Sequence, residues 1–299
     1  MMKRWSALLL TLLFLAASGA CAENRPQGSV NLLTGKTVLV SLYLQEEGED
    51  WTREEMRYTR RAMALATEYL TAAARAAGAE AQLVWDESDL RYPLEYDGAA
   101  RDADRDDNRF YDRVMQRAVK AVSAQALMER YGTDSLGYIA FVHAAGTSYS
   151  LCYYAGDADS YDEVCVLYLT DADLPGQYES VPVYAHELLH LFGAIDLYEP
   201  FAEDGVTREL VRYVERNLPD ELMLTTYEPD DSISHTGISQ TLSDITLYSV
   251  GLIADTPLLS QFPTIRRSQP GAFGTNEITT EEEEAPSGPS WYEQTLESR

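Results

Sequence analysis

The sequence has 299 residues, of which 45% are hydrophobic and 24% are charged, and this composition argues against collagen-like, coiled-coil and wholly disordered chains. The length is sufficient for one or two domains that bury a core. Acidic residues outnumber basic ones by 49 to 23, so the net charge is -26, and we expect neither nucleic acid nor an anionic membrane surface as a partner.

The first 22 residues have the layout of a secretory signal. Basic residues precede an apolar run over 7–17, and small residues occupy 18–22. The apolar run is too short to span a bilayer comfortably. Cleavage after Ala22 would release the protein, whereas cleavage before Cys21 would expose that cysteine for lipid attachment, as in bacterial lipoproteins. We therefore predict an exported protein, either secreted or anchored to the outer face of the cell membrane through Cys21.

The chain between residues 23 and 265 alternates strand-like and helix-like patterns and forms one predicted domain. Apolar β-rich runs predict strands, and amphipathic segments that end at a glycine predict helices. In chain order the prediction is strand 37–44, helix 53–77, strand 81–85, helix 109–131, and strands 137–143, 148–154 and 164–170. This order predicts an α/β (α+β) fold whose sheet has mixed strand directions.

Two segments of the chain are strongly acidic. In residues 102–108, carboxylates alternate with other residues as in calcium-binding loops, but the glycine and the closing glutamate of an EF-hand are missing. We interpret this segment as a solvated loop, with a calcium site as the alternative. Residues 266–299 contain the run Glu281–Glu284 among prolines and glycines, which predicts a disordered acidic tail.

Removal of the signal leaves two cysteines, Cys152 and Cys165. Both fall in neighbouring predicted strands, so in an oxidising compartment a disulfide between them is one interpretation. Two buried free thiols are the other. Neither cysteine has a base nearby in the sequence that would mark it as a nucleophile.

The sharpest chemical signal is the segment HELLHLFGAID, which begins at His186. On a helix, His186 and His190 are one turn apart on the same face, so both imidazoles can take corners of a tetrahedral zinc site. Glu187 is rotated by about 100° around the helix axis, from where it can reach a water at the metal without being a ligand. The alternative, a surface helix with two unrelated histidines, is disfavoured by the apolar background.

The end of this segment supplies a third candidate ligand. Gly193 permits the positive φ that ends a helix, and the turned chain can return Asp196 to the metal. Three protein ligands leave the fourth position of a tetrahedral zinc ion open, and this is the arrangement of catalytic rather than structural zinc.

The segment resembles the zinc signature HExxHxxGxxH/D of the metzincin metallopeptidases, and its aspartate variant resembles the snapalysin-like secreted bacterial branch. The resemblance implies a mixed five-stranded sheet with one antiparallel edge strand, long helices, an active-site helix and a small C-terminal subdomain closed by a helix over 239–253. It also implies a methionine turn beneath the metal, with Met223 as the candidate. Some branches place a tyrosine two residues after this methionine. Here Thr225 stands there, so Tyr227 is the candidate for oxyanion support.

These observations predict a zinc-dependent endopeptidase that acts on a peptide or protein substrate, with one zinc ion and with Glu187 as general base. The strand near 148–154 would pair with an extended substrate. Two other interpretations stay open: a non-catalytic binding protein of the cell surface on the same fold, and a metallohydrolase of non-protein amides in the cell wall.

Overall fold

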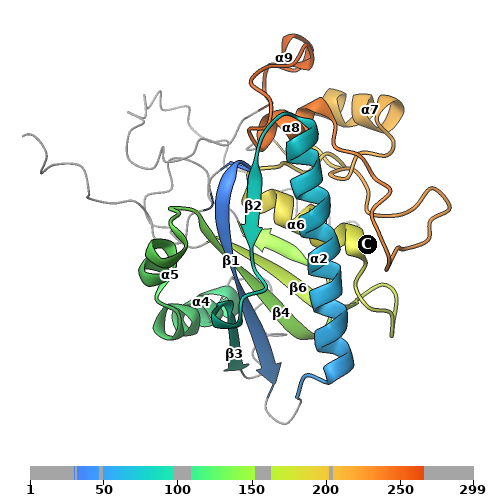
Figure 1. The fold of residues 1–299 in the computed structure, drawn as a ribbon. Coiled ribbons are helices and arrows are strands. Elements are labelled where there is room, and N and C mark those ends of the chain that lie inside the picture. The colour runs from blue at the N-terminus through green and yellow to red at the C-terminus, as the bar shows by residue number, and fades with distance from the viewer. Residues whose placement is uncertain are drawn as a thin grey trace, which may run out of the picture.

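A six-stranded, mostly parallel sheet forms the centre of the molecule (Figure 1). The computed structural model describes residues 30, 32–46, 50–96, 109–151, 163–201 and 205–265. The strands are β1 (Gly35–Glu46), β2 (Ala81–Val84), β3 (Arg91–Tyr96), β4 (Leu136–Gly146), β5 (Tyr149–Leu151) and β6 (Val164–Asp171). Their order is β2-β1-β4-β6-β5, with β3 also paired to β1, and β5 is antiparallel to β6 at one edge. The predicted mixed α/β class and the antiparallel edge strand are confirmed.

The expected number of five strands is wrong because β3 is an additional strand. β2 and β3 follow one another along the same side of β1, with Ala81 opposite Gly35 and Arg91 opposite Ser41. The short 3-10 helix η1 (Ser88–Leu90) connects them. Pro93 in the middle of β3 weakens the sequence pattern of a strand, and a proline is tolerated here because β3 pairs with β1 alone among the described strands.

Helices cover both faces of this sheet (Figure 1). One face packs against α2 (Arg53–Ala76) and α6 (Val181–Leu191), and the other against α4 (Arg109–Ala121) and α5 (Ala124–Tyr131). Alternate residues of each strand enter the two cores: in β1, Leu39 packs toward α2 and α6, whereas Val40 packs toward α4 and α5. The single helix predicted over 109–131 is in fact two helices, because Ser123 is the N-cap of a new helix.

The predicted helix over 53–77 is confirmed as α2. It begins with a capping box, in which Thr52 Oγ1 accepts a hydrogen bond from the Glu55 amide (3.2 Å) and the Glu55 carboxylate accepts one from the Thr52 amide (2.7 Å). Its buried face, which includes Met63 and Leu70, packs on α6. α2 therefore supports the helix that carries the HExxH residues.

Beyond α6 the described chain contains α7 (Arg208–Asn217), α8 (Asp244–Ser249) and α9 (Leu258–Gln261), which lie beyond one end of the sheet (Figure 1). The helix predicted over 239–253 is wrong in length, because only the six residues of α8 are helical. Thr241 pairs with a distant segment instead: its amide donates to the Asp220 carbonyl (2.7 Å), and its carbonyl accepts from the Leu222 amide (2.9 Å).

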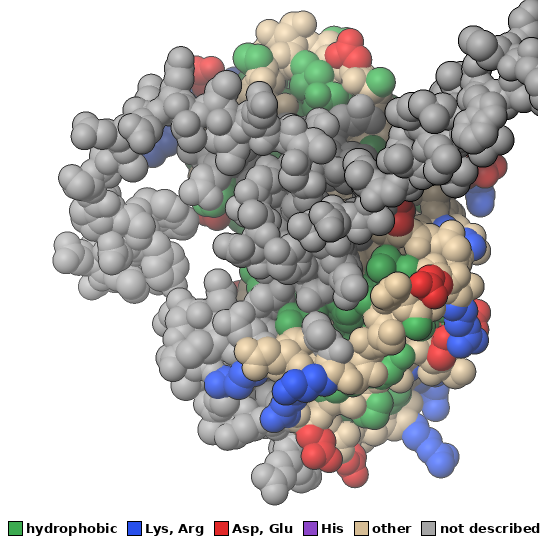
Figure 2. All heavy atoms as spheres, turned by 90° about the vertical axis from the view of Figure 1, so that its left-hand side faces the viewer, with side chains coloured by type: hydrophobic (Ala, Val, Ile, Leu, Met, Phe, Trp, Pro, Cys, Tyr) green, Lys and Arg blue, Asp and Glu red, His purple; other side chains and the backbone are tan. Residues whose placement is uncertain are grey.

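The side of the molecule on which α4 and α5 lie carries acidic and basic side chains in close mixture among the described residues (Figure 2). Within the described part of the chain, the structure contains no helix long and apolar enough to cross a membrane. The predicted signal (1–22), the candidate calcium loop (102–108) and the predicted acidic tail (266–299) lie outside the described residues.

Candidate metal centre

α6 carries the two histidines of the HExxH segment on one buried surface. The helix follows Ser180 as N-cap, has a proline in its first turn and ends at Leu191. Gly193 follows with a φ of 91°, and this left-handed turn directs the chain back toward the helix. His186 is buried, and His190 is partly exposed. The helix and its glycine turn are as the sequence predicts.

The three predicted ligands come together at the end of α6. His186 Nε2 and His190 Nε2 lie 3.2 Å apart, and each lies 3.2 Å from Asp196 Oδ1. Among the described residues, these three form the one group of at least three His, Cys, Asp or Glu side chains with metal-ligand spacing. In a tetrahedral zinc site with bonds of about 2.0–2.1 Å, ligand atoms are about 3.3–3.4 Å apart. The observed triangle therefore fits three corners of such a site.

Two backbone carbonyls fix the tautomers of the histidines. His186 Nδ1 lies 3.0 Å from the Leu222 carbonyl oxygen, and His190 Nδ1 lies 2.9 Å from that of Ala194. A carbonyl oxygen can only accept, so each Nδ1 must donate its hydrogen. In the neutral imidazoles each Nε2 then presents a lone pair toward the other and toward Asp196 Oδ1. Metal-ligating histidines are commonly oriented in this way.

Three lone pairs that face one another require a positive charge between them. Asp196 Oδ1 is buried and makes no hydrogen bond to another group among the described residues. Burial lowers the pKa of His190, but the Asp196 carboxylate outweighs it and raises this pKa to about 9. Conversely, burial would raise the pKa of Asp196, and the two histidines hold it well below its usual range. The site therefore favours a cation, either a proton or a metal ion.

Tyr198 completes the surroundings of the third ligand. Its hydroxyl donates to Asp196 Oδ2 (3.1 Å), and its ring stacks beside that of His186 with centroids 6.5 Å apart. With Oδ2 occupied by this bond, Oδ1 faces the histidines. Burial and the Asp196 charge raise the pKa of Tyr198, so the hydroxyl keeps its proton at neutral pH. The sequence patterns do not single out this residue, although its position two residues after Asp196 is a local signal.

Glu187, the predicted general base, is buried beside the cluster and held by the edge strand β5. Ser150 Oγ lies 2.9 Å from Glu187 Oε2 and 2.8 Å from the Glu187 backbone carbonyl oxygen. Glu187 Oε1 makes no hydrogen bond within the described part of the chain, which leaves this oxygen available to a reacting group. Ser150 is a further site residue that sequence spacing does not reveal, because it comes from a strand distant in the chain.

The segment around Met223 contacts α6 and the chain that follows it, and a methionine turn beneath the metal stays a prediction. Besides the bond from His186 to the Leu222 carbonyl, the Leu197 amide donates to the Met223 carbonyl (2.9 Å), and the Met223 side chain is fully buried. Glu221, also fully buried, accepts hydrogen bonds from the Met223 amide (3.2 Å), the Thr246 hydroxyl (2.8 Å) and the Ser243 amide. This carboxylate therefore fastens the segment to the start of α8.

A second buried carboxylate, Glu179, lies near Glu187. Its oxygens accept from the Ser148 hydroxyl (2.8 Å) and the Ser180 amide (2.9 Å). Burial raises its pKa to about 7, and the negative charges of Asp171 and Glu187 contribute in the same direction. Near neutral pH this side chain is therefore partly protonated, which limits the negative charge beside Glu187.

Tyr227 and the cysteines are the remaining candidates from the sequence. The Tyr227 side chain is 41% exposed, and burial together with the charges of Asp171 and Asp173 raises its pKa. No contact joins it to the metal-binding cluster within the described residues, so oxyanion support by Tyr227 stays a prediction. The Cys165 side chain is fully buried. Cys152 lies outside the described residues, so the disulfide also stays a prediction.

Comparisons with known proteins add no assignment to this geometry. No protein-family model matches the chain, and no curated protein matches it.

Proposed function

We propose that the protein is a zinc-dependent endopeptidase. The observation that carries the proposal is the triangle of His186, His190 and Asp196 ligand atoms, 3.2 Å apart, with both imidazoles oriented by backbone carbonyls. Among the described residues, no fourth protein ligand joins this triangle, so one coordination position is left for a water molecule. The buried Glu187 lies next to it. A structural zinc site would close all four positions with protein ligands.

The reaction that these residues support is hydrolysis of a peptide bond. When bound, a zinc ion lowers the pKa of a water molecule toward about 7 and polarises a carbonyl group. Glu187 Oε1 takes the proton of the attacking water and passes it to the leaving amine, as general base and then general acid. Ser150 holds the other carboxylate oxygen, so that Glu187 keeps one orientation through both transfers.

The position of β5 supports a peptide as the substrate. β5 pairs with β6 on one side and is the edge of the described sheet on the other, so an extended chain can add to it by backbone hydrogen bonds. Ser150 joins β5 to Glu187, and a chain paired along β5 therefore passes beside the general base. Export of the enzyme stays a prediction from residues 1–22.

Removal of the metal is expected to abolish cleavage reversibly. Protein without residues 1–22 should contain one zinc ion per chain by atomic absorption, and it should cut peptides of a mixed library, with the fragments identified by mass spectrometry. A chelator should stop cleavage, and added zinc should restore it, because backbone carbonyls hold both imidazoles in their orientation. Cleavage that persists after complete zinc removal would refute the proposal. Bound zinc without peptide cleavage would favour the binding-protein or cell-wall alternatives.

Replacing Ser150 with alanine is expected to lower kcat by about 10–100-fold while KM and zinc affinity stay unchanged. A hydrogen bond to a charged group contributes roughly 1.5–3 kcal/mol, and here it orients Glu187 rather than the substrate or the metal. Steady-state kinetics and zinc titration measure the three quantities. Ser150→Thr, which keeps a hydroxyl, should retain most of kcat. An equal loss in both variants would show that packing, and not the hydroxyl, is responsible.

A further inference from the structure

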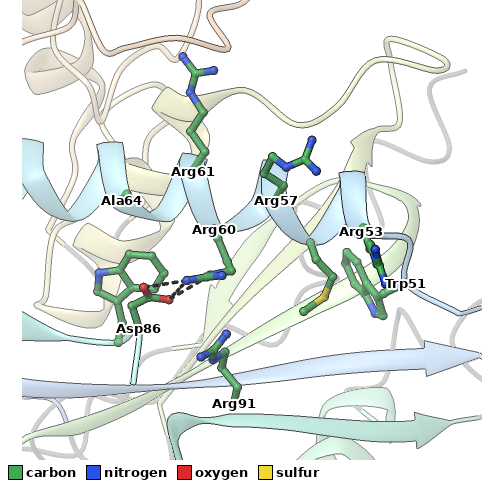
Figure 3. Close-up of a pocket in the computed structure, with 10 residues that line it drawn as sticks. Trp51, Arg53, Arg57, Arg60, Arg61, Ala64, Asp86 and Arg91 are labelled. Atoms are coloured by element: carbon green, nitrogen blue, oxygen red, sulfur yellow. Dashed lines mark hydrogen bonds and ion pairs between the residues drawn. The ribbon is translucent and has the colours of Figure 1, made fainter. Parts of the chain in front are cut away.

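A cationic groove lies along α2 (Figure 3), and none of the three candidate metal ligands lines it. Its cavity volume is about 630 Å³, and its walls come from the first half of α2, the segment after β2 and the start of β3. Five of the chain's 23 basic residues line it: Arg53, Arg57, Arg60, Arg61 and Arg91. Only one acidic residue, Asp86, lies among the lining residues. In a chain with a net charge of -26, this concentration of positive charge is a local exception.

Most of this positive charge is not neutralised. Arg60 points toward Asp86 and binds it through two hydrogen bonds, of 2.9 and 3.0 Å (Figure 3). Arg53, Arg57 and Arg61 are exposed and make no ion pair within the described part of the chain. Arg53 lies beside Trp51, whereas Arg57 and Arg61 point from the helix away from Arg60 and Asp86 (Figure 3). The groove therefore presents several free guanidinium groups, each able to bind a carboxylate through two parallel hydrogen bonds.

The placement of these arginines is unfavourable for the helix itself. Arg53, Arg57 and Arg61 follow one another at i, i+4 spacing, where like charges repel. They also lie in the N-terminal half of α2, and Arg53 shares the first turn with Glu54 and Glu55, which offset part of its unfavourable interaction with the helix dipole. Both costs are relieved when an anion lies along the stripe.

Aromatic walls give the groove a fixed shape. Trp51 and Trp85 are half-buried at its sides. The Trp51 indole donates to the Leu44 carbonyl (2.9 Å) and packs edge-on against Tyr43, with ring centroids 5.4 Å apart. Neighbouring apolar surface lowers the local dielectric, which strengthens contacts between guanidinium groups and a bound anion.

The spacing of the stripe matches an extended acidic peptide. Residues at i and i+4 of an α-helix are separated by about 6 Å along the axis. Alternate side chains of an extended chain are about 6.6–6.8 Å apart on one face. Carboxylates on alternate residues can therefore face successive arginines.

We propose that this groove binds the acidic segment of the same chain, Glu277–Glu284. This segment carries Glu277 and the run Glu281–Glu284, and it lies outside the described residues. The chain from Ile265, where the description ends, to Glu281 can reach up to about 50 Å, more than the length of α2. Such a tether gives the segment an effective concentration on the order of millimolar at the groove. The proposal does not depend on the metal centre or on its activity.

The test measures binding of a fluorescein-labelled synthetic peptide copying residues 275–288 by fluorescence anisotropy. The proteins are the full chain and a variant in which Glu277 and Glu281–Glu284 are all glutamine. The peptide should bind the glutamine variant at least ten-fold more tightly than the parent, since the parent's own segment occupies the groove. Binding should weaken as salt increases.

Two double substitutions in the glutamine variant locate the binding. Arg57→Gln with Arg61→Gln should weaken peptide binding at least ten-fold. Arg208→Gln with Arg212→Gln is the matched control, because these exposed arginines of α7 have the same i, i+4 spacing and the same charge change. Thermal melting verifies that each variant is folded. Equal peptide affinity for the parent and the glutamine variant would overturn the assignment to the chain's own segment. No peptide binding, or an equal loss in the α7 control, would overturn the groove as the site.

Discussion

Replacing Glu187 with alanine is expected to reduce peptide hydrolysis by about 10²–10⁴-fold, the range for loss of a positioned general base. Zinc affinity should remain close to that of the parent, because the Glu187 carboxylate is not one of the three atoms that form the ligand triangle. Turnover of a peptide identified in the library experiment and zinc stoichiometry by atomic absorption measure the two effects separately.

The His190→Ala variant provides the contrast to Glu187→Ala. It removes one ligand atom together with the bond to the Ala194 carbonyl, so bound zinc and turnover should both be lost. If Glu187→Ala retained full turnover, Glu187 would not be the general base. If it lost zinc as completely as His190→Ala, its role would be to build the site rather than to transfer protons.

Replacing Glu221 with alanine is expected to lower the free energy of unfolding by about 3 kcal/mol or more. The change leaves the Met223 amide, the Ser243 amide and the Thr246 hydroxyl without their buried acceptor. It should also weaken zinc binding by about 10–100-fold, because the same segment supplies the Leu222 carbonyl that orients His186. Urea denaturation and zinc titration measure these effects.

The adjacent Asp220 offers a matched control for Glu221. Asp220 is exposed, and the hydrogen bonds described for it come from its backbone, so Asp220→Ala should change the free energy of unfolding by less than about 0.5 kcal/mol. Glu221→Gln, which keeps one acceptor oxygen, should fall between the two alanine variants. Equal stability of the Glu221→Ala and Asp220→Ala proteins would contradict the role assigned to the buried carboxylate.

The sequence predicts those parts of the site whose determinants are local. The histidines and Glu187 lie on one helix, and Asp196 follows a glycine turn, so the helix together with the turn after it brings the four close to one another. α2 is predicted equally well because its cap and its apolar face are contained in one segment. The mixed sheet follows from the alternation of strand and helix patterns.

The parts that the sequence does not reveal depend on contacts between distant segments. Ser150 reaches Glu187 only because β5 pairs antiparallel to β6, and Glu221 acts through α8. β3 has a proline in its middle and becomes a strand by pairing with β1. The C-terminal helix is shorter than its apolar pattern suggests, because Thr241 pairs with a distant part of the backbone.

The orientation of both imidazoles by main-chain carbonyls has a consequence for mutational tolerance. Leu222 and Ala194 contribute oxygens that every amino acid possesses, so exchange of their side chains for others of similar size leaves the acceptors in place. Chain conformation, and not side-chain identity, is what these two positions must preserve. Substitutions should be harmful instead at the positions that set the backbone conformation there. These are Gly193, which has a positive φ, and Glu221, which accepts hydrogen bonds from three donors. Deep mutational scanning of this protein would thus find that Leu222 and Ala194 tolerate substitution, whereas the adjacent Glu221 and Gly193 do not.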